Sequence, residues 1–181
     1  MSKIGKKNIP LPAGVEVKIT GKHVDVKGPK GNLSYHLLDG VNAELKDGVI
    51  YVTVEGDHFK NLRWLTRTLI ANMVNGVVQG FEKKMHMIWV GYNVKQQGTG
   101  LLFNLGLSHS VNFALPQGVS SKLEKNAKGE DLITISWIDK QLVGETAAKL
   151  KSLKWPESYK GKGIRYFGEV IKLKAGKTAK K

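Results

Sequence analysis

Residues 15–31 read VEVKITGKHVDVKGPKG, and this stretch decides the fold of the N-terminal half of the chain. Its apolar residues alternate with polar ones, at Val15, Val17 and Ile19 and then at Val24 and Val26. Such alternation is typical of strands that are buried on one face. Gly21 separates the two runs, and Gly28-Pro-Lys-Gly31 predicts a turn before a third strand over 32–37. The stretch therefore predicts three consecutive strands joined by tight turns.

The residues that follow predict another strand and then a helix. Asp47-Gly48 is a hairpin-turn dipeptide, and residues 49–54 (VIYVTV) are rich in β-branched side chains. Asp57 is expected to cap a helix that runs to about Val78. Its expected apolar stripe, at spacings of three and four, is Leu62, Leu65, Leu69 and Met73.

Parts of this pattern recur 70 residues later. Gly21, Val24 and Gly28 are matched by Gly91, Val94 and Gly98. Val41-Asn42 and Leu45 are matched by Val111-Asn112 and Leu115. Because the matches keep the same order and the same offset, they favour an internal duplication.

The second copy predicts strands near 85–90, 101–105, 111–115, 119–124 and 132–138. Asp139 is then expected to cap a helix to about Leu153, with Val143, Ala147, Leu150 and Leu153 facing inward. The fold class predicted is α+β, with two similar small domains from an internal duplication. Each is expected to pack an antiparallel sheet against one helix. The expected domains are 1–81 and 82–181, the second ending in a basic extension over about 156–181.

Positive charge is concentrated at the two ends of the chain. The formal net charge is +14, of which residues 1–30 contribute +5 and residues 149–181 contribute +9, while the charges of residues 31–148 balance. A neutral body with basic ends is typical of a folded module that binds a polyanion. Only three of the 29 basic residues are Arg, so the expected contacts are to phosphates more than to base edges. A basic tail that serves solubility alone is the alternative reading.

The chain lacks the residues that several classes of function need. The chain has no cysteine, which excludes disulfides and thiolate chemistry. No apolar run approaches the roughly 18 residues of a membrane span, and a soluble protein is expected. Gly176-Lys-Thr178 resembles the end of a P-loop, but Ile171 stands where that motif needs glycine. The five histidines are never at i, i+4 spacing, and the carboxylates are scattered. We expect no catalytic residue, cofactor, metal or small-molecule substrate.

The segment Pro156-Glu-Ser-Tyr-Lys-Gly-Lys-Gly-Ile-Arg-Tyr166 holds the clearest functional motif. Its lysines and arginine supply charge, and its aromatic residues, with Phe167, could stack on bases. Gly161 and Gly163 are expected to let the backbone approach RNA closely, so Gly163→Val should impair binding. A flexible basic loop is the alternative. Trp64 and Trp89 are expected in the core, and Trp155 at the root of the tail. Removing residues 157–181 is expected to leave both cores intact.

The chain also resembles a known family. Residues 156–164, the opening Ile4-Gly-Lys-Lys7, and the segments 69–74 and 139–144 resemble ribosomal protein six of the large subunit, bacterial type. The resemblance covers essentially the whole chain. Ser158 and Ser110 stand where proline is commoner in that family, which affects local loop rigidity. The resemblance implies a structural protein that binds domain VI of the large-subunit rRNA, near the sarcin–ricin loop and the stalk base.

The expected RNA contacts combine this resemblance with the charge pattern. The tail residues Lys160, Lys162 and Arg165 and the loop residues Ser108 and His109 follow from the resemblance. The charge and the motif add Lys149, Lys151, Lys154, Tyr159, Gly161, Gly163, Lys172, Lys174 and Lys177. Expected partners are large-subunit rRNA and neighbouring ribosomal proteins near the stalk base, without a membrane and without homo-oligomers. The ribosome is expected to be cytoplasmic, and an organellar one stays compatible. An RNA-modifying enzyme and a free nucleoid binder are the rival functions.

Overall fold

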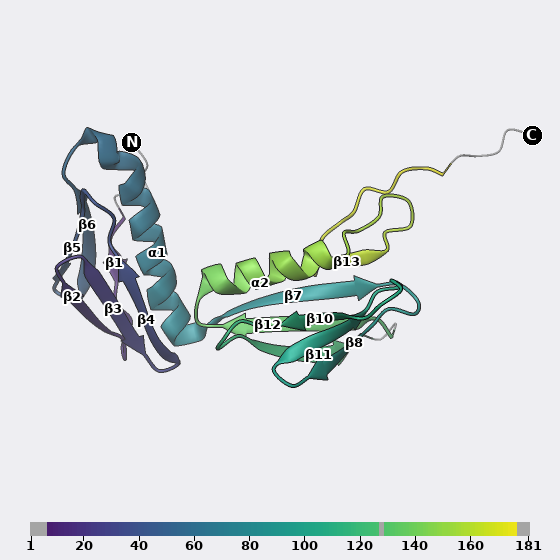
Figure 1. The fold of residues 1–181 in the computed structure, drawn as a ribbon. Helices are drawn as coiled ribbons and strands as arrows, with labels where there is room; N and C mark the ends of the chain where they lie inside the picture. The colour runs from purple at the N-terminus through teal and green to yellow at the C-terminus, as the bar shows by residue number, and fades with distance from the viewer. Residues whose placement is uncertain (1–6, 127–128, 177–181) are drawn as a thin grey trace, which may run out of the picture. The chain divides into compact units, whose positions relative to one another are not determined.

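The computed structural model describes residues 7–126 and 129–176. The chain divides into two units, one of residues 1–81 with 138–140 and the other of residues 82–137 with 141–181. Each unit combines antiparallel strands with one α-helix (Figure 1). The α+β class and the duplication are thus confirmed, with one difference in detail. The strands of each unit form two sheets where a single sheet was expected.

The first unit packs one helix against two three-stranded sheets. One sheet has the order β2-β3-β4, from Glu16–Thr20, His23–Gly28 and Gly31–His36. The other has the order β1-β6-β5, from Ile9–Pro10, Val49–Val54 and Val41–Lys46. Alternation buries Val24 and Val26 of β3 and Ile50 and Val52 of β6 against α1 (Lys60–Gln79). The first two turns and the three strands lie where the sequence predicts them.

The start of α1 differs from the prediction. A 3-10 turn, η2 (Asp57–Phe59), precedes the helix, so Phe59 takes the N-cap position that was expected for Asp57, and no side chain caps it. The buried face of α1 is Thr66, Ile70, Met73, Val74, Gly76 and Val77. The expected stripe is therefore only partly right, since Leu65 is 38% exposed. Trp64, which was expected in the core, is 44% exposed.

The second unit repeats this plan and adds a strand. One sheet has the order β8-β9-β10, from Asn93–Gln97, Gly100–Asn104 and Val111–Ala114. The other has the order β11-β12-β7-β13, from Ser120–Lys125, Asp131–Trp137, Phe81–Ile88 and Gly163–Tyr166. Helix α2 (Lys140–Leu153) runs along the four-stranded sheet (Figure 1). It begins directly after Asp139 and buries Val143, Ala147 and Leu150, as predicted, whereas Leu153 is only half-buried.

The duplication is real, but its register is not the predicted offset of 70. Strands β2-β3-β4 correspond to β8-β9-β10, and β1-β6-β5 correspond to β7-β12-β11, because the pairing orders match. The turn glycines confirm this register. Gly21 and Gly98, 77 residues apart, have φ of 60° and 57°, while Gly14 and Gly91, also 77 apart, have φ of 83° and 88°. The offset of 70 matched similar letters at positions that are not equivalent in the fold.

Strand β13 makes part of the C-terminal tail a strand of the second unit's sheet. It pairs with β7 in an antiparallel register, with Ile164 opposite Met87 and Arg165 opposite His86. Ile164 is completely buried. The expectation that both cores are complete without residues 157–181 is therefore wrong for 163–166, because this segment completes the edge of a sheet and fills part of the core.

Candidate nucleic-acid interface

The tail motif forms a closed loop between α2 and β13. The Glu157 N–H donates to the Lys162 carbonyl at 2.9 Å, and the Gly161 N–H donates to the Glu157 carbonyl at 3.0 Å. Ile164 N–H donates to the Lys154 carbonyl at 2.9 Å, which anchors the loop to the end of α2. These backbone bonds give the loop one shape, so it is not the flexible segment of the alternative reading.

The two glycines are needed inside the protein. A Cβ on Gly163 would lie 2.7 Å from the Trp155 carbonyl oxygen and 2.9 Å from the Lys154 carbonyl oxygen, and the φ of Gly163 is +142°. Gly161 is also buried, with φ of +71°. The expectation that Gly163 serves close approach to RNA is corrected accordingly, because the backbone that it approaches is its own.

An ion pair between Lys151 and Glu169 holds the segment after β13 on helix α2. The Glu169 carboxylate accepts from the Lys151 ammonium at 2.6 Å and from the Tyr166 N–H at 3.0 Å. The Lys151 hydrogen bond, together with that N–H and against the effect of burial, holds the pKa of Glu169 below its ordinary value. Lys174 N–H donates to the Ser158 carbonyl at 2.8 Å, which brings residues 171–174 back to the loop.

Lys151 therefore has a structural use. Its side chain is only 12% exposed, and besides Glu169 its ammonium lies 4.8 Å from the Tyr166 ring centroid and 5.4 Å from that of Trp155. An ammonium with these partners holds the tail on α2 and has little surface left for a phosphate. We leave Lys151 out of the interface proposed below.

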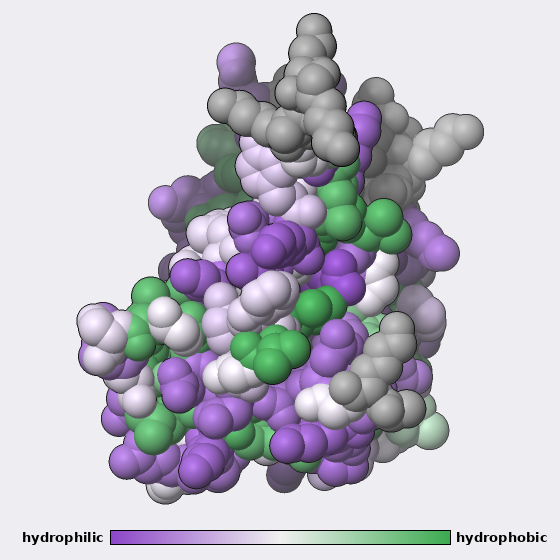
Figure 2. All heavy atoms as spheres, turned by 90° about the vertical axis from the view of Figure 1, so that its right-hand side faces the viewer, coloured by the Kyte–Doolittle hydropathy of each residue, from purple (hydrophilic) through white to green (hydrophobic). Residues whose placement is uncertain are grey.

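The other expected basic residues divide by exposure. Lys149, Lys160, Lys172 and Lys174 are exposed, while Lys154, Lys162 and Arg165 are half-buried. Lys149 pairs with Glu145 at 2.7 Å on the surface of α2. Lys177 lies outside the described residues. Exposed aromatic rings accompany the lysines, with Tyr159 56%, Trp155 64% and Phe167 63% exposed. On the face shown in Figure 2, hydrophobic residues form small patches among hydrophilic ones.

The turn between β7 and β8 joins this region, and sequence reasoning missed it. The Lys162 ammonium lies 3.6 Å from the centroid of the Trp89 ring. Tyr92, in the same turn, contacts the other expected segment, since a Cβ on Gly106 would lie 3.3 Å from Tyr92 Cε1. Ser108 and His109 are exposed in that loop between β9 and β10. Trp89 is 39% exposed and so is not the core residue that was expected.

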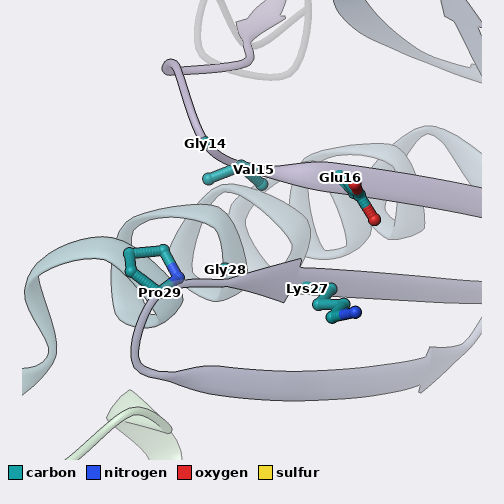
Figure 3. A pocket seen from close by; sticks show the side chains of 6 residues that line it. All are labelled: Gly14, Val15, Glu16, Lys27, Gly28 and Pro29. Atoms are coloured by element: carbon teal, nitrogen blue, oxygen red, sulfur yellow. The ribbon is translucent and has the colours of Figure 1, made fainter.

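Two depressions on the described residues hold no catalytic constellation. An open depression of about 470 Å³ in the first unit is lined by Glu16 and Lys27, a cross-strand pair, with Gly14, Val15, Gly28 and Pro29 (Figure 3). One of about 420 Å³ in the second unit lies beside Trp89 and Asp131, whose carboxylate accepts from the Val94 N–H at 3.3 Å. Among the described residues, no three His, Cys, Asp or Glu side chains group as metal ligands. No helix in this part of the chain has the length and apolarity to cross a membrane.

Comparison with known proteins identifies the chain. The family model described as "Ribosomal protein L6" matches residues 11–80 and 88–167, one match for each copy of the duplicated unit. Both copies of the duplicated fold, and the basic segment up to residue 167, thus match a family of ribosomal proteins. "Large ribosomal subunit protein uL6" of Synechocystis sp. is 47% identical over 183 residues, and that of Salinispora arenicola is 46% identical over 184, each covering 100% of both chains. The chain belongs to the ribosomal protein L6 family, which confirms the resemblance seen in its motifs.

Proposed function

We propose that the chain is a structural constituent of the large ribosomal subunit that binds large-subunit rRNA and has no catalytic role. The observation that carries the proposal is the shaped tail loop. Tyr159 and Lys160 are exposed on this loop, and the segment with the exposed Lys172 and Lys174 returns to it because the Lys174 N–H donates to the Ser158 carbonyl. Exposed ammonium groups suit phosphates, and exposed rings suit unstacked bases or riboses.

The proposed interface extends over one end of the second unit. It comprises Lys149, Lys154, Tyr159, Lys160, Lys162, Arg165, Lys172, Lys174 and, outside the described residues, Lys177. The turn 89–92 and the loop with Ser108 and His109 complete it, since Trp89 contacts Lys162 and Tyr92 lies beside Gly106 of that loop. Gly161 and Gly163 shape the loop from within. We assign residues 82–181 to this RNA-binding domain and residues 1–81 to a separate domain.

The finer placement follows the resemblance to the family. The rRNA site proposed is the domain VI region near the sarcin–ricin loop and the base of the stalk, with ribosomal proteins there as neighbours. One copy per particle, without homo-oligomers, is expected. Binding through A-form shape and phosphates agrees with a surface that has many lysines and few arginines.

Sedimentation of ribosomal subunits tests the function. The tagged chain should co-sediment with the large subunit at one copy per particle and survive a wash that removes loosely bound proteins. Chemical probing of the rRNA in those particles should show protection confined to the proposed region. Binding to nucleic acid without a fixed stoichiometry would instead favour the free nucleoid binder.

A further inference from the structure

Helix α1 of the first unit carries a basic and aromatic stripe, here defined as Lys60, Arg63, Trp64 and Arg67. These residues stand at i, i+3, i+4 and i+7, so their side chains lie along one face of the first two turns. Two of the three arginines of the whole chain are in this stripe. The stripe lies outside the basic tail, within residues 31–148, whose positive and negative charges balance overall.

The stripe is unfavourable for the helix that carries it. Three cations stand in the first eight residues of α1, where the helix dipole favours anions, and the sequence of the helix contains no Asp or Glu. Phe59 at the N-cap gives no side-chain hydrogen bond either. Residues that destabilise the element in which they stand are expected at functional sites.

The structure holds both arginines in place. Arg63 Nε donates to the Val52 carbonyl of β6 at 2.9 Å, and Arg67 Nε donates to the Lys7 carbonyl at 3.0 Å. Each bond uses one of the five N–H donors of a guanidinium. Among the side chains that the structure describes, which do not include that of Asp57, no carboxylate forms an ion pair with either arginine. The planar groups are therefore oriented in advance and keep donors for a bidentate partner.

The charge of the first unit also depends on this stripe. Over residues 1–81, the residues outside the stripe include eight Lys against seven acidic residues, so the stripe supplies three of the four net positive charges. Trp64 stands between the two arginines and is 44% exposed. A large ring left in water beside two arginines suits an unstacked base whose neighbouring phosphates meet the guanidinium groups.

We infer that this stripe is a second RNA-binding site, on the first unit, for an unpaired stretch of rRNA. The inference rests on the proposed ribosomal function and adds a site separate from the tail. Two arginines beside an exposed indole favour RNA over an acidic protein segment. An acidic segment would match the charge but would have no base to stack on the ring.

A photo-crosslinking residue, p-benzoylphenylalanine, at position 64 tests the site within assembled large subunits. The same residue in place of Asn75 is the matched control. Asn75 is exposed on the same helix about 16 Å further along, beyond the stripe. Crosslinks from position 64 to rRNA, and none from position 75, are the expected result. Crosslinks from position 64 to a protein alone, or to nothing, would overturn the inference. Failure of the wild-type chain to co-sediment would count against the proposed function itself.

A second experiment tests the same site without an unnatural residue. Hydroxyl-radical footprints are compared for subunits with the wild-type, Arg67→Gln or Lys18→Gln chain, after thermal melting has shown that each variant is folded. Lys18 is exposed on β2 of the same unit, outside the stripe. Arg67→Gln should abolish a footprint separate from that of the tail, whereas Lys18→Gln should keep it. An unchanged footprint for Arg67→Gln would overturn the inference.

Discussion

The ammonium of Lys151, on α2, lies 2.6 Å from the Glu169 carboxylate, beyond β13, and so ties the tail to the helix. The two side chains are 12% and 28% exposed, and the same carboxylate accepts the Tyr166 N–H. Charged groups that are largely withdrawn from water and paired with each other are costly to separate. The basic segment is thereby part of a folded domain, which gives it a defined shape without any partner.

Glu169→Gln should lower the free energy of unfolding by on the order of 1–2 kcal/mol, because a charge-assisted hydrogen bond is weakened. Glu145→Gln is the matched control, since Glu145 also pairs with a lysine of α2, Lys149, but the two side chains are 52–60% exposed. That change should cost less than about 0.5 kcal/mol. Denaturant melts of both variants make the comparison, and equal losses would contradict the structural role of Glu169.

The same pair predicts a dependence of stability on pH. The Lys151 hydrogen bond lowers the pKa of Glu169 below 4.5, its ordinary value, so folding stabilises the ionised form. The contribution is fully present above pH 4.5 and is lost as the pH falls through the folded pKa. The stability difference between wild type and Glu169→Gln should therefore shrink as the pH falls below 4.5. A difference that stays constant to lower pH would contradict the assignment.

Gly163→Ala should destabilise the protein by roughly 3 kcal/mol or more, because its Cβ would overlap backbone atoms and its φ is positive. Gly168→Ala is the control. Its φ is +80° but no atom lies within 4 Å of the added carbon, so a cost of about 1 kcal/mol from conformation alone is expected. Thermal melts without RNA measure both. If Gly163→Ala melts like wild type and loses only RNA binding, the original expectation of close approach to RNA is restored.

Ile164→Ala should cost about 2–5 kcal/mol, because this side chain of β13 is fully buried. Val170→Ala, at a side chain that is 92% exposed, should change stability by less than about 0.5 kcal/mol. Likewise, a chain ending at residue 156 should melt at a much lower temperature than one ending at residue 176, since only the shorter chain lacks β13. Equal melting temperatures for the two truncated chains would show that β13 is dispensable.

The class of fold could be predicted from the sequence because strand alternation and helix spacing are local signals. The strands β2 and β3 and the inward face of α2 are examples. The register of the repeat could not, because glycines are common in turns of every kind. Only the strand pairings and the φ values of Gly21 and Gly98 show which turns are equivalent.

The candidate site could be predicted only in part, because the sequence shows where charged and aromatic residues stand but not what their side chains contact in the fold. A run of lysines shows where charge is, but not which ammonium is used internally, as that of Lys151 is. Trp64 and Trp89 were expected in the core because indoles are mostly apolar, whereas their exposure depends on tertiary neighbours such as Lys162. Strand β13 was missed because GIRY is short and its partner β7 is distant in the sequence.

The salt dependence of rRNA binding tests the central claim, that the shaped basic tail binds rRNA phosphates. Lys160, Lys172 and Lys174 are exposed, so replacing all three with Gln should leave the fold intact, as a melt would verify. Affinity for a large-subunit rRNA fragment is measured over a series of salt concentrations for wild type and the triple variant. The slope of log K against log salt should become shallower by about two to three, since each lost phosphate contact removes about 0.7–0.9. An unchanged slope and affinity, with the fold intact, would contradict the claim.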